Sequence, residues 1–169
     1  MELIGRMLEG SIPYNPKDAA PRAGFFGFRL RQEDKIEHLS HVPLLAGSTR
    51  RQLRAVARIA EVRERPAGTV LTRAGEPGDE FFLLLDGRVG VEVSGRKRGK
   101  LGPGDVFGEM SLLDGGPRTA TITAETAVRL LVIRRRDFTL LLNKVPDLTR
   151  HLLLVLSRRL RQAEQTPNA

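Results

Sequence analysis

One short stretch of the chain combines an acid, an arginine and an unusual amount of glycine. Residues 107–121 read FGEMSLLDGGPRTAT, which places Glu109 and Arg118 nine residues apart. A guanidinium is a planar, permanently charged fork that matches phosphate oxygens, whereas a carboxylate accepts hydrogen bonds from hydroxyl groups. The two together suit a ribose phosphate. The same two side chains can also simply pair across a turn, and the residue types alone do not choose between these interpretations.

The residues around this stretch indicate how it is held. GPGD at 102–105 is a turn signal. From Gly108 onward, GEMSLL can form one short helical turn, and the unpaired N–H groups at its start favour an anion.

A β-rich region is predicted on both sides of the stretch, from about residue 61 to residue 133. Short runs of β-forming residues alternate there with Gly, Pro and Asp. About eight such strands predict an antiparallel barrel or jelly roll. The Asp86-Gly87 pair between two apolar runs predicts a hairpin, and SGRKRG at 94–99 is interpreted as a turn.

Helical spacing precedes and follows this region. Residues 33–47 and 48–60 predict two helices, with Ser48 as the N-cap of the second. Its apolar residues on one face are Leu53, Val56, Ala57 and Ile59. After residue 134, a first helix ends near Pro146 and a long one follows. The long helix has leucines every four residues, at 148, 152, 156 and 160, in a stripe broadened by Leu153 and Val155. This apolar face must pack against the barrel or against a second copy.

The predicted fold class is α+β, mainly β: an eight-stranded antiparallel jelly roll flanked by N-terminal and C-terminal helices. Residues 1–31, rich in Pro and Gly, are expected to be a flexible segment, in which Phe25, Phe26 and Phe28 could dock on the folded body. The domain is expected over residues 32–165, with the barrel at about 61–133 and closing helices at about 134–165. Residues 166–169 form a tail.

Composition narrows the class of protein. The formal charge is +8, and residues 129–169 hold nine Lys and Arg against three Asp and Glu. Phe138 is the only aromatic residue after residue 128, which favours a solvated helical face over a nucleic-acid platform. The absence of cysteine excludes a disulfide scaffold and a thiolate metal site. No transmembrane span or signal peptide is predicted, and a cytoplasmic location is expected.

The stretch as a whole resembles the phosphate-binding cassette of the cyclic nucleotide-binding domain family, which includes catabolite activator proteins and regulatory subunits of protein kinase A. The family pattern is F-G-E, an aliphatic residue, a small residue and Leu, followed after a spacer by P-R-small-A-Thr/Ser. This chain supplies FGEMSL at 107–112 and PRTAT at 117–121. The resemblance covers about residues 38–163 and includes GEPGDEFFLLLDGRV at 75–89.

The resemblance implies roles for particular residues. Glu109 accepts the ribose 2′-hydroxyl, Arg118 holds the phosphate oxygens, and Gly108 lets the backbone approach the sugar. The other implied ligand neighbours are Phe107, Met110, the backbone N–H groups of Ser111 and Thr119, Val91 and Leu101 beside the base, and Arg159, which can pair with Glu109. The expected ligand is cAMP, with cGMP as the alternative because Thr119 resembles cGMP-preferring kinase sites. No cofactor and no metal are expected. The residue that covers the base is left open among Leu156, Leu160, Arg158, Arg159 and another segment.

Two rival functions fit the residues less well. A metal-dependent barrel enzyme needs inward histidines, but His38, His41 and His151 all fall in predicted helices, and no Ser-His-Asp or Cys-His set is present, so no enzyme is expected. DNA-binding relatives continue into a helix-turn-helix domain, whereas this sequence ends at Ala169, so specific DNA binding is not expected. The prediction is a regulatory module whose C-terminal helices move when a cyclic nucleotide binds. A homodimer or a partner protein would use the last helix. A DNA-associated regulator or a degenerate scaffold that acts through a partner protein is the alternative.

Overall fold

The computed structural model describes residues 30–165. The predicted flexible segment, apart from its last two residues, and its three phenylalanines lie outside the described residues, as does the predicted tail. Within the described part, the elements in chain order are α2 Gln32–Ser40, η2 Pro43–Leu45, α3 Arg50–Ile59, β1 Glu61–Arg65, β2 Val70–Thr72, β3 Glu80–Asp86, β4 Val89–Val93, β5 Arg96–Leu101, β6 Val106–Phe107, α4 Glu109–Asp114, β7 Thr121–Ala124, β8 Val128–Arg134, α5 Arg135–Lys144 and α6 Pro146–Gln165.

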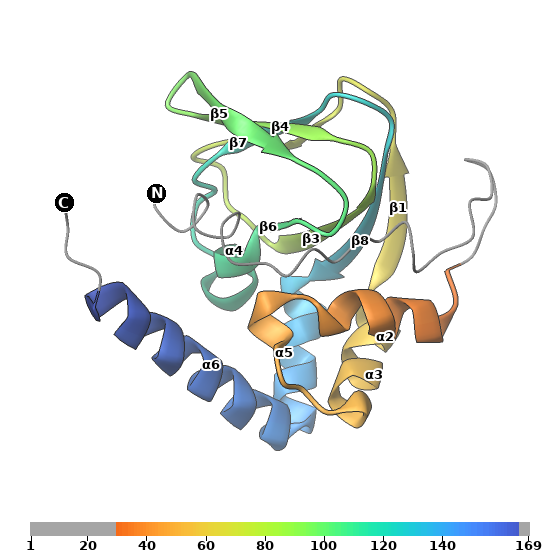
Figure 1. The fold of residues 1–169 in the computed structure, drawn as a ribbon, viewed down its shortest axis with the longest axis vertical. Helices are drawn as coiled ribbons and strands as arrows, with labels where there is room; N and C mark the ends of the chain where they lie inside the picture. Colours follow the sequence, from red (N-terminus) through yellow and green to blue (C-terminus); the bar gives the residue numbers. More distant parts are fainter. Residues whose placement is uncertain (1–29, 166–169) are drawn as a thin grey trace.

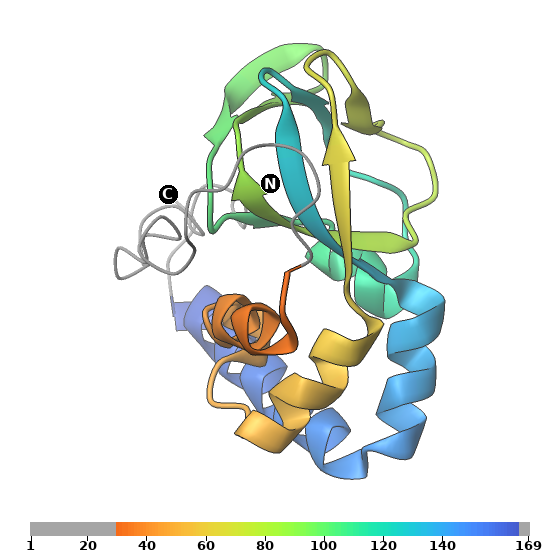
Figure 2. The same cartoon turned by 90° about the vertical axis from the view of Figure 1, so that its right-hand side faces the viewer.

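The strands form two four-stranded sheets that face each other. One sheet has the order β1-β8-β3-β6 and the other β2-β7-β4-β5, with antiparallel pairing throughout. In Figures 1 and 2 the helices α2, α3, α5 and α6 gather at one end of this barrel, and α4 lies at the barrel edge nearest to them. The predicted eight-stranded jelly roll with flanking helices is confirmed.

The apolar runs of β3 and β8 are continuous because both faces of their sheet are covered. Successive side chains on a strand point to opposite faces. One set fills the barrel interior and the other packs against the helices. The interior set includes Phe82, Leu84, Leu130 and Val132, and the set facing the helices includes Phe81, Leu83, Leu131 and Ile133.

Two predicted turns near β4 and β5 are wrong. Asp86-Gly87 does not join paired strands, because β3 and β4 belong to different sheets. The turn instead carries the chain from one sheet to the other, with Gly87 at φ 92°. The hairpin lies at Ser94-Gly95, where Val93 pairs with Arg96. Most of the predicted turn at 94–99 is therefore strand β5, an edge strand whose Lys and Arg side chains protect an open sheet edge.

The N-cap of α3 is Thr49 and not Ser48. The hydroxyl of Thr49 accepts a hydrogen bond from the backbone N–H of Gln52, and the backbone N–H of Thr49 donates to the side chain of Gln52. This capping box needs a glutamine or glutamate three residues after the cap, and only Thr49 has one.

Helix α6 buries only the first half of its predicted leucine stripe. Leu148, Leu152 and Val155 are buried, whereas Leu153 and Leu160 are each 63% exposed. Nε2 of His151, in α6, lies 2.5 Å from the carbonyl oxygen of Ala46, just after η2. The early turns of α6 therefore dock on the N-terminal helices. The later turns extend away from them (Figure 1).

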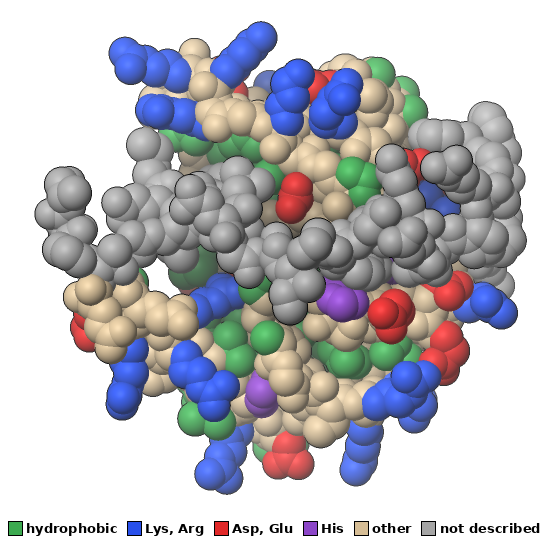
Figure 3. Space-filling view, in the orientation of Figure 1, with side chains coloured by type: hydrophobic (Ala, Val, Ile, Leu, Met, Phe, Trp, Pro, Cys, Tyr) green, Lys and Arg blue, Asp and Glu red, His purple; other side chains and the backbone are tan. Residues whose placement is uncertain are grey.

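Basic side chains gather in two parts of the chain, residues 129–169 and the β4–β5 hairpin. The sequence placed the positive charge in the last quarter of the chain, and Figure 3 shows a second group of Lys and Arg side chains over the β4–β5 hairpin. The exposed residues of β5 are Arg96, Lys97, Arg98, Gly99 and Lys100. Among the described residues, no helix is long and apolar enough to cross a membrane.

Candidate functional site

The stretch that joins β6 to β7 forms the predicted turn and helix. Gly108 is the N-cap of α4 with φ 79°, and Gly115 ends the helix with φ 65°. Both values lie in the left-handed region, which glycine adopts without the steric penalty of a Cβ atom. The two glycines therefore set the direction in which the six residues of α4 leave β6 and return towards Arg118.

A second segment, residues 75–79 before β3, runs alongside the chain at Arg118. Gly75 N–H donates to the carbonyl of Arg118, and Arg118 N–H donates to the carbonyl of Glu76, each at 2.8 Å. Pro77 and Pro117 form an isolated antiparallel bridge next to them. These bonds fix the backbone of Arg118 from both sides.

The side chain of Arg118 is held at one end only. Its Nη2 donates to the backbone carbonyl of Glu80 at 2.8 Å, and its guanidinium carbon lies 5.7 Å from the centre of the Phe82 ring. Its Nη1 is buried and has no hydrogen-bond partner within residues 30–165. Burial lowers the pKa of Arg118, while Asp79 and Glu80 oppose this shift. A buried cationic N–H without an acceptor is costly, so this group is suited to an anionic ligand.

Two glycines leave the space that this guanidinium occupies. A Cβ atom on Gly108 would lie 2.5 Å from Nη1 of Arg118 and 2.6 Å from the carbonyl oxygen of Glu80. A Cβ atom on Gly78 would lie 2.4 Å from Oγ of Ser111 and 2.7 Å from Nε of Arg118. Real Cβ contacts are not this short. The arginine and the start of α4 can thus approach each other only with glycine at both positions.

Glu109 does not pair with Arg118, so the simple acid–arginine turn is excluded. Glu109 is 6% exposed, and its Oε1 accepts a hydrogen bond from Nη1 of Arg159 in α6 at 2.9 Å. Burial raises the pKa of Glu109, and the charge and hydrogen bond of Arg159 oppose this shift. The predicted pairing of Arg159 with Glu109 is confirmed, and it links α4 to a helix fifty residues further along the chain.

An apolar wall continues from the arginine into the barrel. The rings of Phe82 and Phe107 stack with their centres 4.8 Å apart. Val91 and Leu101, which the sequence placed beside a base, are buried in the same cluster. They come from β4 and β5 of the opposite sheet.

The remaining predicted residues divide into buried and exposed ones. Ser111 is buried and its hydroxyl donates to the carbonyl of Gly116 at 3.3 Å. Met110 is 53% exposed and Thr119 is also exposed, so these two side chains do not join the buried group. Of the lid candidates, Leu156 packs partly against the helical core and Leu160 faces outward.

Three residues that surround the Arg118 side chain were not predicted from the sequence: Glu80, Phe82 and Gly78. Glu80 acts through its backbone carbonyl, which no residue type reveals. Phe82 and Gly78 had a signal, because both lie in the stretch 75–89 that carried part of the resemblance. Histidines take no part: His38 lies in α2, His41 follows it and His151 lies in α6. No group of three or more potential metal ligands occurs among the described residues.

An antiparallel jelly roll with a glycine-shaped turn, an arginine short of one acceptor and a buried acid defines a small-molecule-binding domain. The sequence profile described as "Cyclic nucleotide-binding domain" matches residues 62–145. The chain belongs to the cyclic nucleotide-binding domain family.

Individual relatives agree with this assignment. A cyclic nucleotide-gated potassium channel of Mesorhizobium japonicum is 40% identical over 128 residues, which are 74% of this chain and 35% of the channel. A cyclic AMP receptor protein of Thermus thermophilus is 33% identical over 127 residues, 72% of this chain and 59% of the receptor. A third relative is the N-terminal domain of a transcriptional regulator from Streptomyces coelicolor, known from a crystal structure. It superposes with a TM-score of 0.71 at 32% identity, and the match covers 78% of this chain and 99% of that domain. The chain thus spans about a third of the channel and more than half of the receptor.

Proposed function

We propose that this domain binds a cyclic nucleotide, cAMP in the first place, in the site formed by α4, Arg118 and the barrel interior. The observation that supports this most directly is the buried Nη1 of Arg118, an N–H donor without a partner among the described residues. The cyclic phosphate supplies the anionic acceptor for this N–H, and a hydrogen bond between a guanidinium and a phosphate oxygen is strengthened by the charges of both groups. A relative named as a cyclic AMP receptor protein favours cAMP over cGMP as the ligand.

Glu109 receives the sugar in this proposal. Its carboxylate is desolvated and, within residues 30–165, accepts one hydrogen bond, from Arg159, so a carboxylate oxygen remains to accept the 2′-hydroxyl. The left-handed turn at Gly108 brings the backbone close to that hydroxyl. The base then lies against Val91 and Leu101 inside the barrel. Ser111 and Thr119 contribute backbone N–H groups near the phosphate.

The ligand signal passes to the C-terminal helices in the same proposal. Glu109 is the acid that meets the sugar and also the partner of Arg159 in α6. A ligand hydroxyl that donates a hydrogen bond to Glu109 therefore changes the free energy of the α4–α6 contact. The population of α6 positions shifts by the difference in ligand affinity for each position. The exposed leucines of α6 provide the surface for a second copy or a partner protein.

The activity proposed is regulation by ligand binding, without catalysis and in the cytoplasm. Regulation fits the named relatives, a channel, a receptor and a transcriptional regulator. A cytoplasmic location fits a chain with no cysteine.

Calorimetric titration with cAMP and with cGMP tests the proposal. Truncating one side of a buried charge pair costs about 2 to 5 kcal/mol, so Arg118→Ala should weaken cAMP binding by roughly 30-fold or more. Arg58→Ala removes an equally charged but exposed side chain from α3 and should bind as the wild type does. If neither nucleotide binds the wild type at millimolar concentration, the proposal is wrong and the chain is a scaffold that has lost its ligand. If cGMP binds more tightly than cAMP, the base preference is wrong while the site stands.

A further inference from the structure

Glu80, the first residue of β3, joins two separate sets of contacts. Its backbone carbonyl accepts the hydrogen bond from Nη2 of Arg118. Its side-chain carboxylate accepts a hydrogen bond from Nη1 of Arg63, in β1, at 2.7 Å. The residue that orients the phosphate arginine is therefore itself held by a second arginine.

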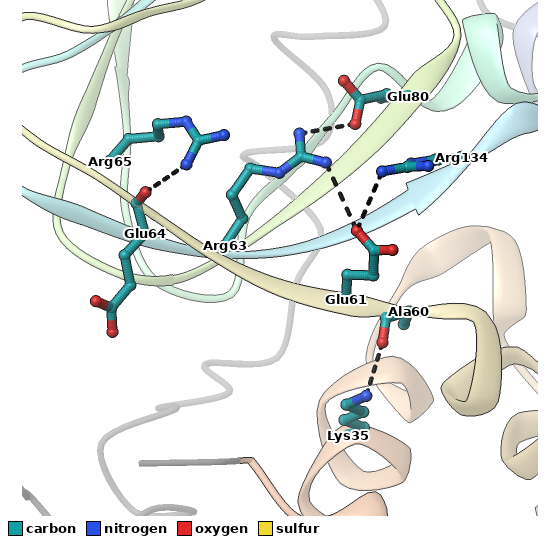
Figure 4. Close-up of polar contacts among 8 residues, drawn as sticks. All are labelled: Lys35, Ala60, Glu61, Arg63, Glu64, Arg65, Glu80 and Arg134. Atoms are coloured by element: carbon teal, nitrogen blue, oxygen red, sulfur yellow. Dashed lines mark hydrogen bonds and ion pairs between the residues drawn. The ribbon is translucent and has the colours of Figure 1, made fainter. Parts of the chain in front are cut away.

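Figure 4 shows that the contacts continue beyond Arg63. Nη2 of Arg63 lies 3.8 Å from Oε2 of Glu61, and Nη2 of Arg134 lies 3.6 Å from the same oxygen. The four side chains come from three strands that are neighbours in the sheet, β1, β8 and β3. Arg134 ends β8 and is the N-cap of α5, so the network reaches the point where the C-terminal helices begin.

Burial differs along this network. The side chains of Arg63 and Glu80 are 19% and 25% exposed, whereas those of Glu61 and Arg134 are more than half exposed. Solvent and salt screen exposed ion pairs strongly and partly buried pairs much less. The Arg63–Glu80 pair is therefore the strong link, and the contacts to Glu61 extend it towards α5 with less energy.

The position of the Glu80 carbonyl matters because the space around it is small. The carbonyl oxygen would lie 2.6 Å from a Cβ atom at position 108, and it accepts the hydrogen bond from Nη2 of Arg118. A rotation of the peptide at Glu80 would move Nη2 of Arg118 and with it Nη1, since a guanidinium is rigid and planar. The preceding residue, Asp79, is also fixed, because its carbonyl accepts the N–H of Arg135 in α5 at 2.7 Å.

We propose that Arg63 is a positioning residue for the ligand site: its ion pair with Glu80 holds the carbonyl that orients Arg118, and so tunes the affinity for the cyclic phosphate from β1, at the edge of the sheet opposite to β6. This inference rests on the proposed function. It adds a residue of β1, outside the stretch 107–121, to those that determine binding.

Binding titrations of methionine variants test the inference. Methionine keeps much of the stem of the arginine side chain and removes its donors. Substitutions along such networks change coupling moderately, so Arg63→Met should weaken cAMP binding by about three- to tenfold. Arg63→Lys keeps the charge but has a single nitrogen, and should fall between the wild type and Arg63→Met. The matched control is Arg65→Met, which removes the same charge from the same strand, where Arg65 is exposed and, in the described part of the chain, donates only to the carbonyl of Glu64.

A double-mutant cycle separates positioning from general loss of structure. Glu80→Met keeps the backbone carbonyl and removes the carboxylate, so it should weaken binding about as much as Arg63→Met. The double variant should bind no more weakly than either single variant, because each has already broken the same pair. Additive losses, or equal affinities of Arg63→Met and Arg65→Met, would overturn the proposal. If Arg63→Met does not fold, Arg63→Lys and Glu80→Met are compared with the control in its place.

A readout without nucleotide keeps this inference distinct from the proposed function. The ¹H–¹⁵N signal of the Arg118 side chain, assigned by its loss in Arg118→Ala, reports the guanidinium directly. It should shift in Arg63→Met and stay in place in Arg65→Met, whether or not cAMP binds. A shifted signal together with no nucleotide binding would refute the proposed function alone. An unchanged signal would refute the positioning role of Arg63.

Discussion

Gly108→Ala tests the geometry of the site at its most crowded point. The substitution adds one methyl group at φ 79°, where that methyl would lie 2.5 Å from Nη1 of Arg118 and 2.6 Å from the carbonyl oxygen of Glu80. The left-handed conformation costs a residue with a Cβ atom about 1 to 2 kcal/mol. The arginine must also move, because the carbonyl belongs to the backbone of β3 and cannot yield easily. Losing its hydrogen bond to that carbonyl costs about 1.5 to 3 kcal/mol more.

Gly68→Ala is the matched control. Gly68 has φ 86° and would place its Cβ atom with nothing within 4 Å, so it imposes the backbone strain without the clash. Chemical denaturation should show a loss of about 1 to 2 kcal/mol for Gly68→Ala and about 2.5 to 5 kcal/mol for Gly108→Ala. Calorimetry should show unchanged cAMP affinity for Gly68→Ala and a loss of about tenfold or more, at 1.4 kcal/mol per factor of ten, for Gly108→Ala. Equal stability and equal affinity of the two variants would refute the crowding of Arg118 against Gly108.

Two further predictions concern the link between α4 and α6. Because burial raises the pKa of Glu109 above its ordinary value of 4.5, the folded state binds a proton there more tightly than the unfolded state does. The unfolding free energy of the wild type relative to Glu109→Gln should therefore fall as pH rises from 4.5 through the raised pKa. Denaturation curves in which this difference grows with pH would contradict the burial of the acid. Arg159→Met removes the hydrogen-bonded cation beside Glu109 and should destabilise the fold by about 1 to 3 kcal/mol and increase hydrogen exchange in the last turns of α6. Arg158→Met, at an exposed neighbouring position, should change neither, and equal effects of the two variants would show that the ion pair contributes nothing to holding α6.

The elements that the sequence predicted well are those governed by local rules. The barrel strands follow from β-forming runs between turn residues, and α4 follows from the two glycines that bound it, Gly108 before EMSLLD and Gly115 after it. Whether a turn joins two paired strands was less predictable. Asp86-Gly87 has the residues of a hairpin, but whether the chain pairs back or crosses to the other sheet depends on which strands already flank β3, and β6 and β8 take both of its edges.

Within the site, the side chains and the contact between Glu109 and Arg159 were predictable, and the contacts of Arg118 were not. Glu109 and Arg118 stand out by type and spacing, and the resemblance supplied Arg159 as the partner of the acid. No residue type could reveal that Arg118 bonds to a backbone carbonyl, because every residue has one. The outward direction of Leu153 and Leu160 was missed for a related reason: a leucine stripe predicts an apolar face but not where the body that it packs against ends.

The most direct test of the central claim, that Arg118 and Glu109 hold a cyclic nucleotide, is a crystal structure of this chain with cAMP. We expect a phosphate oxygen within hydrogen-bond distance of Nη1 of Arg118, the 2′-hydroxyl on the carboxylate of Glu109, and Nη2 still on the carbonyl of Glu80. Phosphate density away from Arg118, with Nη1 of that arginine still lacking an acceptor, would contradict it.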